Sequence, residues 1–182
     1  MPPADARDAI VGALIGQLLD DGSAARLNQV LVRQKKVATE VSGGLNWPLG
    51  SPFAYGGPTL LTTLINYPAE VSADTVLSAH DAAIAELRAK GVSAVELERT
   101  RTKMLADWYG ELERPVDRAT ALAHAVLFFG STDRVMQLGG QLAGVTSADV
   151  QAFVAKYLVP ANRTVIVRNP AAGAATRSTG GK

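Results

Sequence analysis

The chain begins with a helical pattern of apolar residues and then changes to the alternation of a strand. Residues 6–19 are apolar almost all round, which predicts a helix buried on most of its surface. Gly22 is placed to adopt the positive φ that closes such a helix. Ser23 is the expected N-cap of a second helix. The buried stripe of that helix is expected at Ala24, Leu27, Val30 and Leu31.

Two strands are expected next. Residues 37–46 alternate between Val or Thr and smaller or charged residues, and residues 53–67 are dense in β-branched and apolar residues. The connection between them is rich in Pro and Gly, which indicates a turn. Gly56 and Gly57 predict a bulge or a late start of the second strand.

The second half of the chain is predicted to be mostly helical. Ser72 is the expected N-cap of a helix that runs to about residue 90 and ends at Gly91, and residues 93–96 have the spacing of a capping box. Pro115 separates that next helix from another over 116–129. Shorter helices are expected at 131–142 and 146–157, and a last strand at 164–167. The order predicts an α+β fold with one mixed, largely antiparallel sheet and helices packed on one face.

Length and composition exclude several classes of protein. The chain has 182 residues, no cysteine and a net charge of +1, so disulfides and thiolate metal sites are excluded and nothing favours nucleic-acid binding. No apolar run is long enough for a membrane span. We expect one domain over 6–170 and a disordered tail over 171–182, since the tail lacks residues to bury.

Several motifs, in a fixed order, carry a family resemblance. They are Ser23 with Arg26-Leu27 and the basic segment 32–36, the segment Gly91–Arg99, and the run from Tyr157 to Thr164. From about residue 9 to residue 170, the chain resembles the second domain of the insulinase/pitrilysin-like zinc metallopeptidases, which include mitochondrial processing peptidase. The resemblance implies a strand before the first helix, and we expect this chain to lack it.

The resemblance also implies candidate site residues. In catalytic relatives, an Arg and a Tyr seven residues later hold the substrate and stabilise the oxyanion. Arg33 matches the Arg, but Glu40 occupies the position of the Tyr, and an ionised carboxylate has no proton to donate. Arg33 is therefore either a solvated surface residue or a contact to substrate or another domain. We include Arg33, Glu40, Arg26 and Gly22 as candidate substrate-binding residues.

No metal site and no catalytic residue is expected in this chain. The zinc motif of the family is His-x-x-Glu-His, whereas His80 and His124 are far apart and have no second histidine at helical spacing. We expect His80 to lie at the edge of the core with a hydrogen-bond partner, and His124 to lie on a solvated face. The resemblance places zinc on a partner domain or subunit.

Two functions are compatible with the sequence and the resemblance. The first is a non-catalytic domain that walls a peptide-binding chamber and docks on a zinc-bearing domain or subunit. The second is an enzymatically silent structural or assembly protein of the same fold. The absence of a first strand would also leave an exposed sheet edge, through which a homodimer or a peptide could pair. The compartment is not determined, with the resemblance favouring the bacterial periplasm over the cytoplasm.

Overall fold

The structure is a computed structural model that describes residue 1 and residues 7–168. Helices dominate this part of the chain, and both strands come early. The elements in order are α1 (Arg7–Asp20), the short π-helix η1 (Asn28–Gln34), β1 (Glu40–Leu45), β2 (Leu61–Asn66), α2 (Ala73–Lys90), α3 (Ala94–Glu113), α4 (Pro115–Phe129), α5 (Asp133–Ala143), α6 (Ser147–Tyr157) and the 3-10 turn η2 (Pro160–Asn162).

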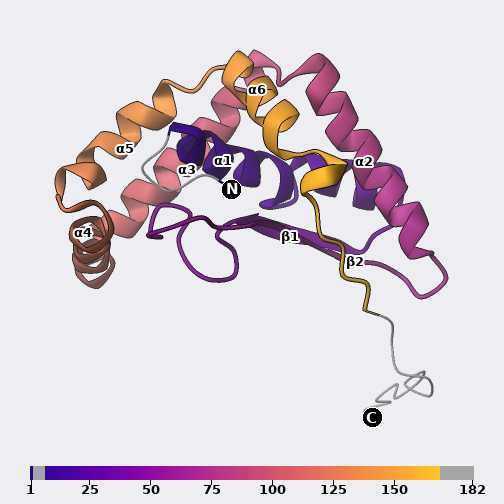
Figure 1. The fold of residues 1–182 in the computed structure, drawn as a ribbon, viewed down its shortest axis with the longest axis horizontal. Helices are drawn as coiled ribbons and strands as arrows, with labels where there is room; N and C mark the ends of the chain where they lie inside the picture. The colour runs from indigo at the N-terminus through magenta and orange to yellow at the C-terminus, as the bar shows by residue number, and fades with distance from the viewer. Residues whose placement is uncertain (2–6, 169–182) are drawn as a thin grey trace, which may run out of the picture.

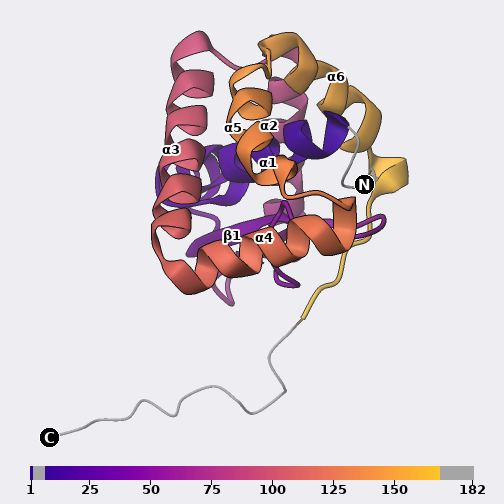
Figure 2. The same cartoon turned by 90° about the vertical axis from the view of Figure 1, so that its left-hand side faces the viewer.

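The two strands form an antiparallel sheet with the helices on one of its faces. Glu40 pairs with Asn66 at one end of the ladder and Leu45 pairs with Leu61 at the other. Figure 1 shows α1 directly above the sheet, with α2, α5 and α6 beyond it. Figure 2 shows the same layers from the side, with α4 across one end. The predicted α+β class with helices on one face is confirmed.

Helix α1 is the centre of the core. Eleven of its fourteen residues are buried, because the sheet covers one side and the helices cover the other. Gly16 lies so close to the sheet that a Cβ added there would be 2.9 Å from the Cα of Gly44 and from the backbone N of Leu45. Gly12 is packed in a similar way against the ring of Phe153. Gly16 therefore lets α1 approach the backbone of β1, and Gly12 leaves room for the ring of Phe153.

The predicted helix boundaries are largely confirmed. The hydroxyl of Ser72 accepts from the backbone N–H of Thr75, Gly91 follows α2 with a positive φ, and Pro115 begins α4. The capping box predicted at 93–96 forms by half: Ser93 accepts from the N–H of Glu96, but the Glu96 carboxylate binds Arg26 instead. Local signals thus place the helix ends, while the partner of Glu96 comes from 70 residues away.

Two segments are predicted wrongly, the start of the second helix and the last strand. Ser23 does not cap a helix, because the chain turns there and becomes helical only at Arg26, which leaves Ala24 exposed. The strand predicted at 164–167 is an extended segment with no ladder: Ile166 is 88% exposed, and no described strand lies beside it to accept its hydrogen bonds. The second strand begins only at Leu61, as its glycines predict. The tail predicted at 171–182 lies outside the described residues.

We predict that Gly16→Ala destabilises the protein by about 1–3 kcal/mol, because backbone atoms of β1 cannot yield to the added methyl. The matched control is Gly110→Ala in α3, where an added Cβ would meet nothing within 4 Å. That change is expected to stabilise the protein by about 0.5–1 kcal/mol, because alanine favours a helix. Urea unfolding measures both values. A Gly16→Ala variant as stable as Gly110→Ala would contradict the close packing of α1 on β1.

Candidate functional site

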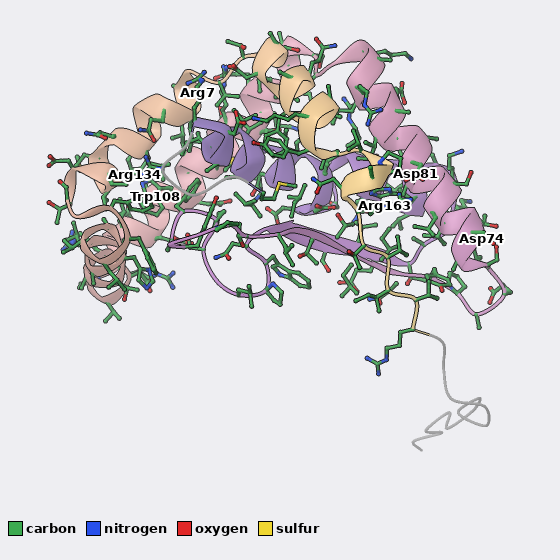
Figure 3. The ribbon with its side chains drawn as sticks, viewed as in Figure 1. Arg7, Asp74, Asp81, Trp108, Arg134 and Arg163 are labelled. Carbon is green, nitrogen blue, oxygen red and sulfur yellow. The ribbon has the colours of Figure 1, made fainter. Side chains whose placement is uncertain are left out.

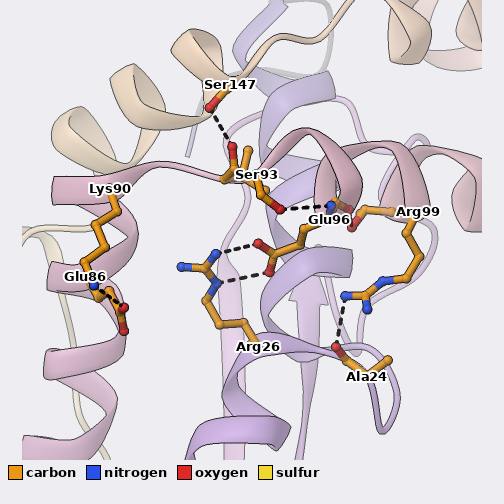
Figure 4. A network of polar contacts seen from close by, with 10 residues as sticks. Ala24, Arg26, Glu86, Lys90, Ser93, Glu96, Arg99 and Ser147 are labelled. Atoms are coloured by element: carbon orange, nitrogen blue, oxygen red, sulfur yellow. Dashed lines mark hydrogen bonds and ion pairs between the residues drawn. The ribbon is translucent and has the colours of Figure 1, made fainter.

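The predicted site residues lie around the turn from α1 to η1 and the start of β1. Arg26 faces α3, where its Nε and Nη2 donate to the Glu96 carboxylate at 3.2 and 2.6 Å (Figure 4). Both side chains are less than one-fifth exposed. Arg99 donates to the backbone carbonyl of Ala24 at 3.3 Å, on the same side of the turn. Arg26 therefore fastens the turn to α3, and its predicted contact with substrate stays a prediction.

Arg33 and Glu40 are both exposed, at the two ends of the segment that joins η1 to β1. Arg33 lies in the last turn of η1 and forms no ion pair with any residue between 7 and 168. The backbone N–H of Lys35 donates to the carbonyl of Val30 at 2.9 Å and closes a wide turn. Lys36 follows with a φ of 54°, which reverses the direction of the chain. Glu40 accepts from the side-chain amide of Asn66 at 3.0 Å. No hydrogen bond joins Arg33 to Glu40, and the Arg33 guanidinium is available to a ligand.

Gly22 adopts a φ of 87°, as the sequence predicts, and a Cβ added there would meet nothing within 4 Å. The acidic turn beside it divides into two environments. Asp21 is exposed, accepts from Gln17 and forms an ion pair with Lys103 at 2.6 Å. Asp20 is instead 1% exposed. Of the two carboxyl groups in this turn, that of Asp21 is therefore solvated and that of Asp20 is buried.

Asp20 is a buried carboxyl group between α1 and the sheet. Both of its oxygens lie 3.1 Å from the hydroxyl of Thr63, which donates to them from β2. Burial raises the pKa of Asp20 to about 7, and the charge of Asp21 adds to the increase, while the Thr63 hydrogen bond opposes it. A signal for this burial is present in the sequence, because Asp20 follows Gly16 by four residues on the face of α1 that meets the sheet.

Neither histidine forms a metal centre with its neighbours. His80 is half-buried on α2 with its Nδ1 3.0 Å from the Asp81 carboxylate, which confirms the expected edge-of-core position. Asp81 also pairs with Arg163, and Figure 3 shows these two side chains where α2 meets the segment after α6. His124 is half-buried with its ring 5.7 Å from that of Phe128, so its predicted solvated position is wrong. Among the described residues, no three acidic or histidine side chains gather to hold a metal ion.

A cavity of about 210 Å³ lies between α3, α4, α5 and the loop before β2. Its walls include the aromatic side chains of Phe53, Trp108 and Phe129, with the rings of Phe53 and Trp108 edge to face at 5.6 Å. Trp108 and Arg134 mark its place in Figure 3. Burial, with the nearby charge of Asp117, raises the pKa of Glu111 at its rim. None of the predicted site residues lines it, and sequence reasoning missed it because its walls come from four separate segments.

No described helix or strand covers the sheet face away from the helices, although the loop between β1 and β2 and the segment after η2 extend on that side (Figure 1). Side chains alternate along a strand, so the residues between those that meet α1 point to this face. Leu64 is 46% exposed there, and Leu60, just before β2, is 66% exposed. Glu40 begins the same face on β1. The described helices include none long and apolar enough to cross a membrane.

We predict that Asp20 makes stability depend on pH. Its pKa of about 7 in the folded protein exceeds the ~3.9 of an unfolded aspartate, so the folded state holds the proton more tightly. The stabilisation is complete below about pH 4 and is lost as the pH rises through about 7. Asp20→Asn removes this titration. Its unfolding free energy relative to the parent is expected to rise by roughly 2–4 kcal/mol between about pH 4.5 and pH 8.

Urea unfolding at a series of pH values measures that difference, with Asp74→Asn as the control. Asp74 is an exposed carboxylate in the first turn of α2, so Asp74→Asn makes the same chemical change away from the buried site. That variant keeps Asp20 and is expected to keep the loss of stability that Asp20 causes between about pH 4.5 and pH 8. An Asp20→Asn variant with the pH dependence of the parent would show that Asp20 is ionised in the folded protein.

No protein-family model and no curated protein sequence matches the chain. Solved structures match it well. A protein described as a zinc protease from Bordetella pertussis Tohama I is 27% identical, with a TM-score of 0.74 over 90% of this chain and 86% of that one. The inactive peptidase domain of a protein described as a zinc protease from Bordetella parapertussis is 26% identical, with a TM-score of 0.75 over 90% and 85%.

A protease from Helicobacter pylori shares the fold at 16% identity, with a TM-score of 0.75 over 87% of this chain. The chain spans 36% of the length of that protease. The structures that resemble it include inactive domains of M16 peptidases, the insulinase/pitrilysin-like family. The chain is thus similar in sequence and fold to the inactive, C-terminal-type domains of the insulinase/pitrilysin-like zinc metallopeptidases.

Proposed function

We propose that the chain is a non-catalytic domain that walls a peptide-binding chamber and docks on a zinc-bearing domain or subunit. The observation that carries the proposal is the uncovered face of the sheet. The described helices lie on the other side of the sheet, except α4, which crosses one end of the molecule. Leu60, Leu64 and the start of β1 are therefore exposed. The likeness to inactive peptidase domains supports a role beside a catalytic partner rather than in its place.

The uncovered face has the chemistry to hold an extended peptide. Every second residue of β1 and β2 directs its backbone N–H and C=O away from the partner strand, so each outer edge offers hydrogen bonds to an added strand. Leu60 and Leu64 offer apolar contact beside that edge. Arg33, exposed and without an ion pair among the described residues, can donate to peptide carbonyls.

Cleavage would in addition require that the developing oxyanion is stabilised, by hydrogen-bond donors or by a metal ion. Glu40 occupies the position of the Tyr donor of catalytic relatives, and its Oε2 accepts from the side-chain amide of Asn66. Zinc and the general base would have to come from the partner. The alternative is an enzymatically silent assembly protein. The replacement of the donor Tyr of catalytic relatives by Glu40 is consistent with that alternative. A neighbouring polypeptide with a His-x-x-Glu-His helix supports the peptidase proposal.

The test is binding of a fluorescent, unfolded peptide, followed by anisotropy. We expect Arg33→Met and Leu64→Asp each to weaken binding about tenfold, equivalent to about 1.4 kcal/mol. Arg118→Met and Val95→Asp are the matched controls, because both residues are exposed on helices away from the sheet face. The controls are expected to bind as the parent does. If the parent and all four variants bind the peptide equally, the peptide does not bind at the uncovered sheet face and the proposal is wrong.

The same samples test whether this chain only binds the peptide while a zinc-bearing partner cleaves it. With added zinc, the chain alone is expected to bind the peptide and leave it intact. Addition of a polypeptide that carries His-x-x-Glu-His is expected to start cleavage. Zinc-dependent cleavage by the chain alone, traced by mass spectrometry and abolished by a chelator, would overturn the proposal.

A further inference from the structure

Helix α4 exposes an unusual number of apolar side chains. Val116, Val126 and Leu127 are 76%, 52% and 73% exposed, and Ala119 and Ala123 are exposed with them. These five residues, the α4 stripe, are spaced i, i+3, i+7, i+10 and i+11, so they share one face about 100° wide. The opposite face of α4 packs on the molecule and includes its buried residue Ala125.

The α4 stripe lies at one end of the molecule. Figure 2 shows α4 across the front of that end, with the other described helices behind and above it. A contiguous apolar face of this kind is rare on a protein that functions as a monomer and marks a place where another surface binds.

The spacing of the α4 stripe is symmetric about position 121. Val116 and Val126 are equally distant from it, and so are Ala119 and Ala123. If two copies of α4 cross antiparallel on a two-fold axis at that level, each valine meets a valine and each alanine meets an alanine. Small residues in the middle let the two backbones approach, while the valines and Leu127 close the ends. Such a surface is complementary to a second copy of itself, as a two-fold interface requires.

Charge does not oppose self-association through this face. The residues that flank the seam, Pro115, Thr120 and Leu122, are uncharged, so the two-fold axis brings no like charges together. The antiparallel arrangement also sets the macrodipoles in opposition, which is favourable. Self-pairing of the extended segment after η2 is worse, because an antiparallel pair centred on 164–167 would place Arg163 opposite Arg168 of the other copy.

We propose that the α4 stripe is the interface of a two-fold symmetric dimer of this chain. The dimer is independent of the peptide chamber, since the sheet face stays open in it. A helix of 15 residues is about 22 Å long. One such helix pair buries less than the ~800 Å² per partner of a standard interface, so the dimer dissociates on dilution.

Sedimentation equilibrium over a range of concentrations tests the dimer. The parent is expected to pass from monomer to dimer as its concentration rises to about 0.5 mM, a concentration high enough to populate a weak dimer. Ala123→Arg, which places two like charges at the seam, is expected to stay monomeric. The control Ala106→Arg introduces the same charge at an exposed alanine of α3 and is expected to dimerise as the parent does. A parent that is monomeric throughout, or an Ala123→Arg variant that still dimerises, overturns the proposal.

The absence of cysteine allows a test of the register as well. The double variant Ala119→Cys with Ala123→Cys is expected to form a disulfide-linked dimer under mild oxidation, because residue 119 of one copy faces residue 123 of the other. Each single variant is expected to crosslink several-fold more slowly, since its cysteine faces an alanine. Equal crosslinking by the two single variants and the double variant would refute this antiparallel register.

Discussion

The close contact between α1 and the sheet is the constraint on which the rest of the structure depends. Gly16 brings the helix to backbone distance from Gly44 and Leu45, and any side chain there would separate the two layers. With the sheet on one side and the remaining helices on the other, α1 has no exposed face that could be polar. The same contact encloses Asp20, whose carboxyl group is held by Thr63 of β2. The burial of this carboxyl group, and with it the raised pKa of Asp20, is thus a consequence of how closely the two layers pack.

This contact also explains which features are open to sequence reasoning. Helix ends are set by neighbours in the chain, so Ser72, Gly91 and Pro115 could be interpreted correctly from the residues around them. Whether residues 164–167 form a strand could not be predicted in this way, because a strand forms only when another lies beside it. The partner of Arg26 and the burial of Asp20 depend on contacts between segments distant in the chain.

The candidate site was predictable in its composition and not in its arrangement. The motifs indicate the family, which the structural matches support, and they bring Arg33 and Glu40 into view. The structure then separates the candidates: Arg26 is bound to Glu96, while Arg33 remains available to a ligand. Two open surfaces remain, the uncovered sheet face and the α4 stripe, and they lie on different elements. One chain can therefore contact a peptide and a second copy without competition.

Amide hydrogen exchange is the sharpest test of the contact between α1 and the sheet, because it reports how much of the structure must open before each backbone hydrogen is released. If α1 is clamped between the sheet and the helices, the amides of its middle turns around Gly16 exchange only through global unfolding. Their protection then equals the free energy of unfolding measured with urea, and the outer turns of α4 exchange sooner. Amides of α1 that exchange as fast as those of α4 would contradict the account.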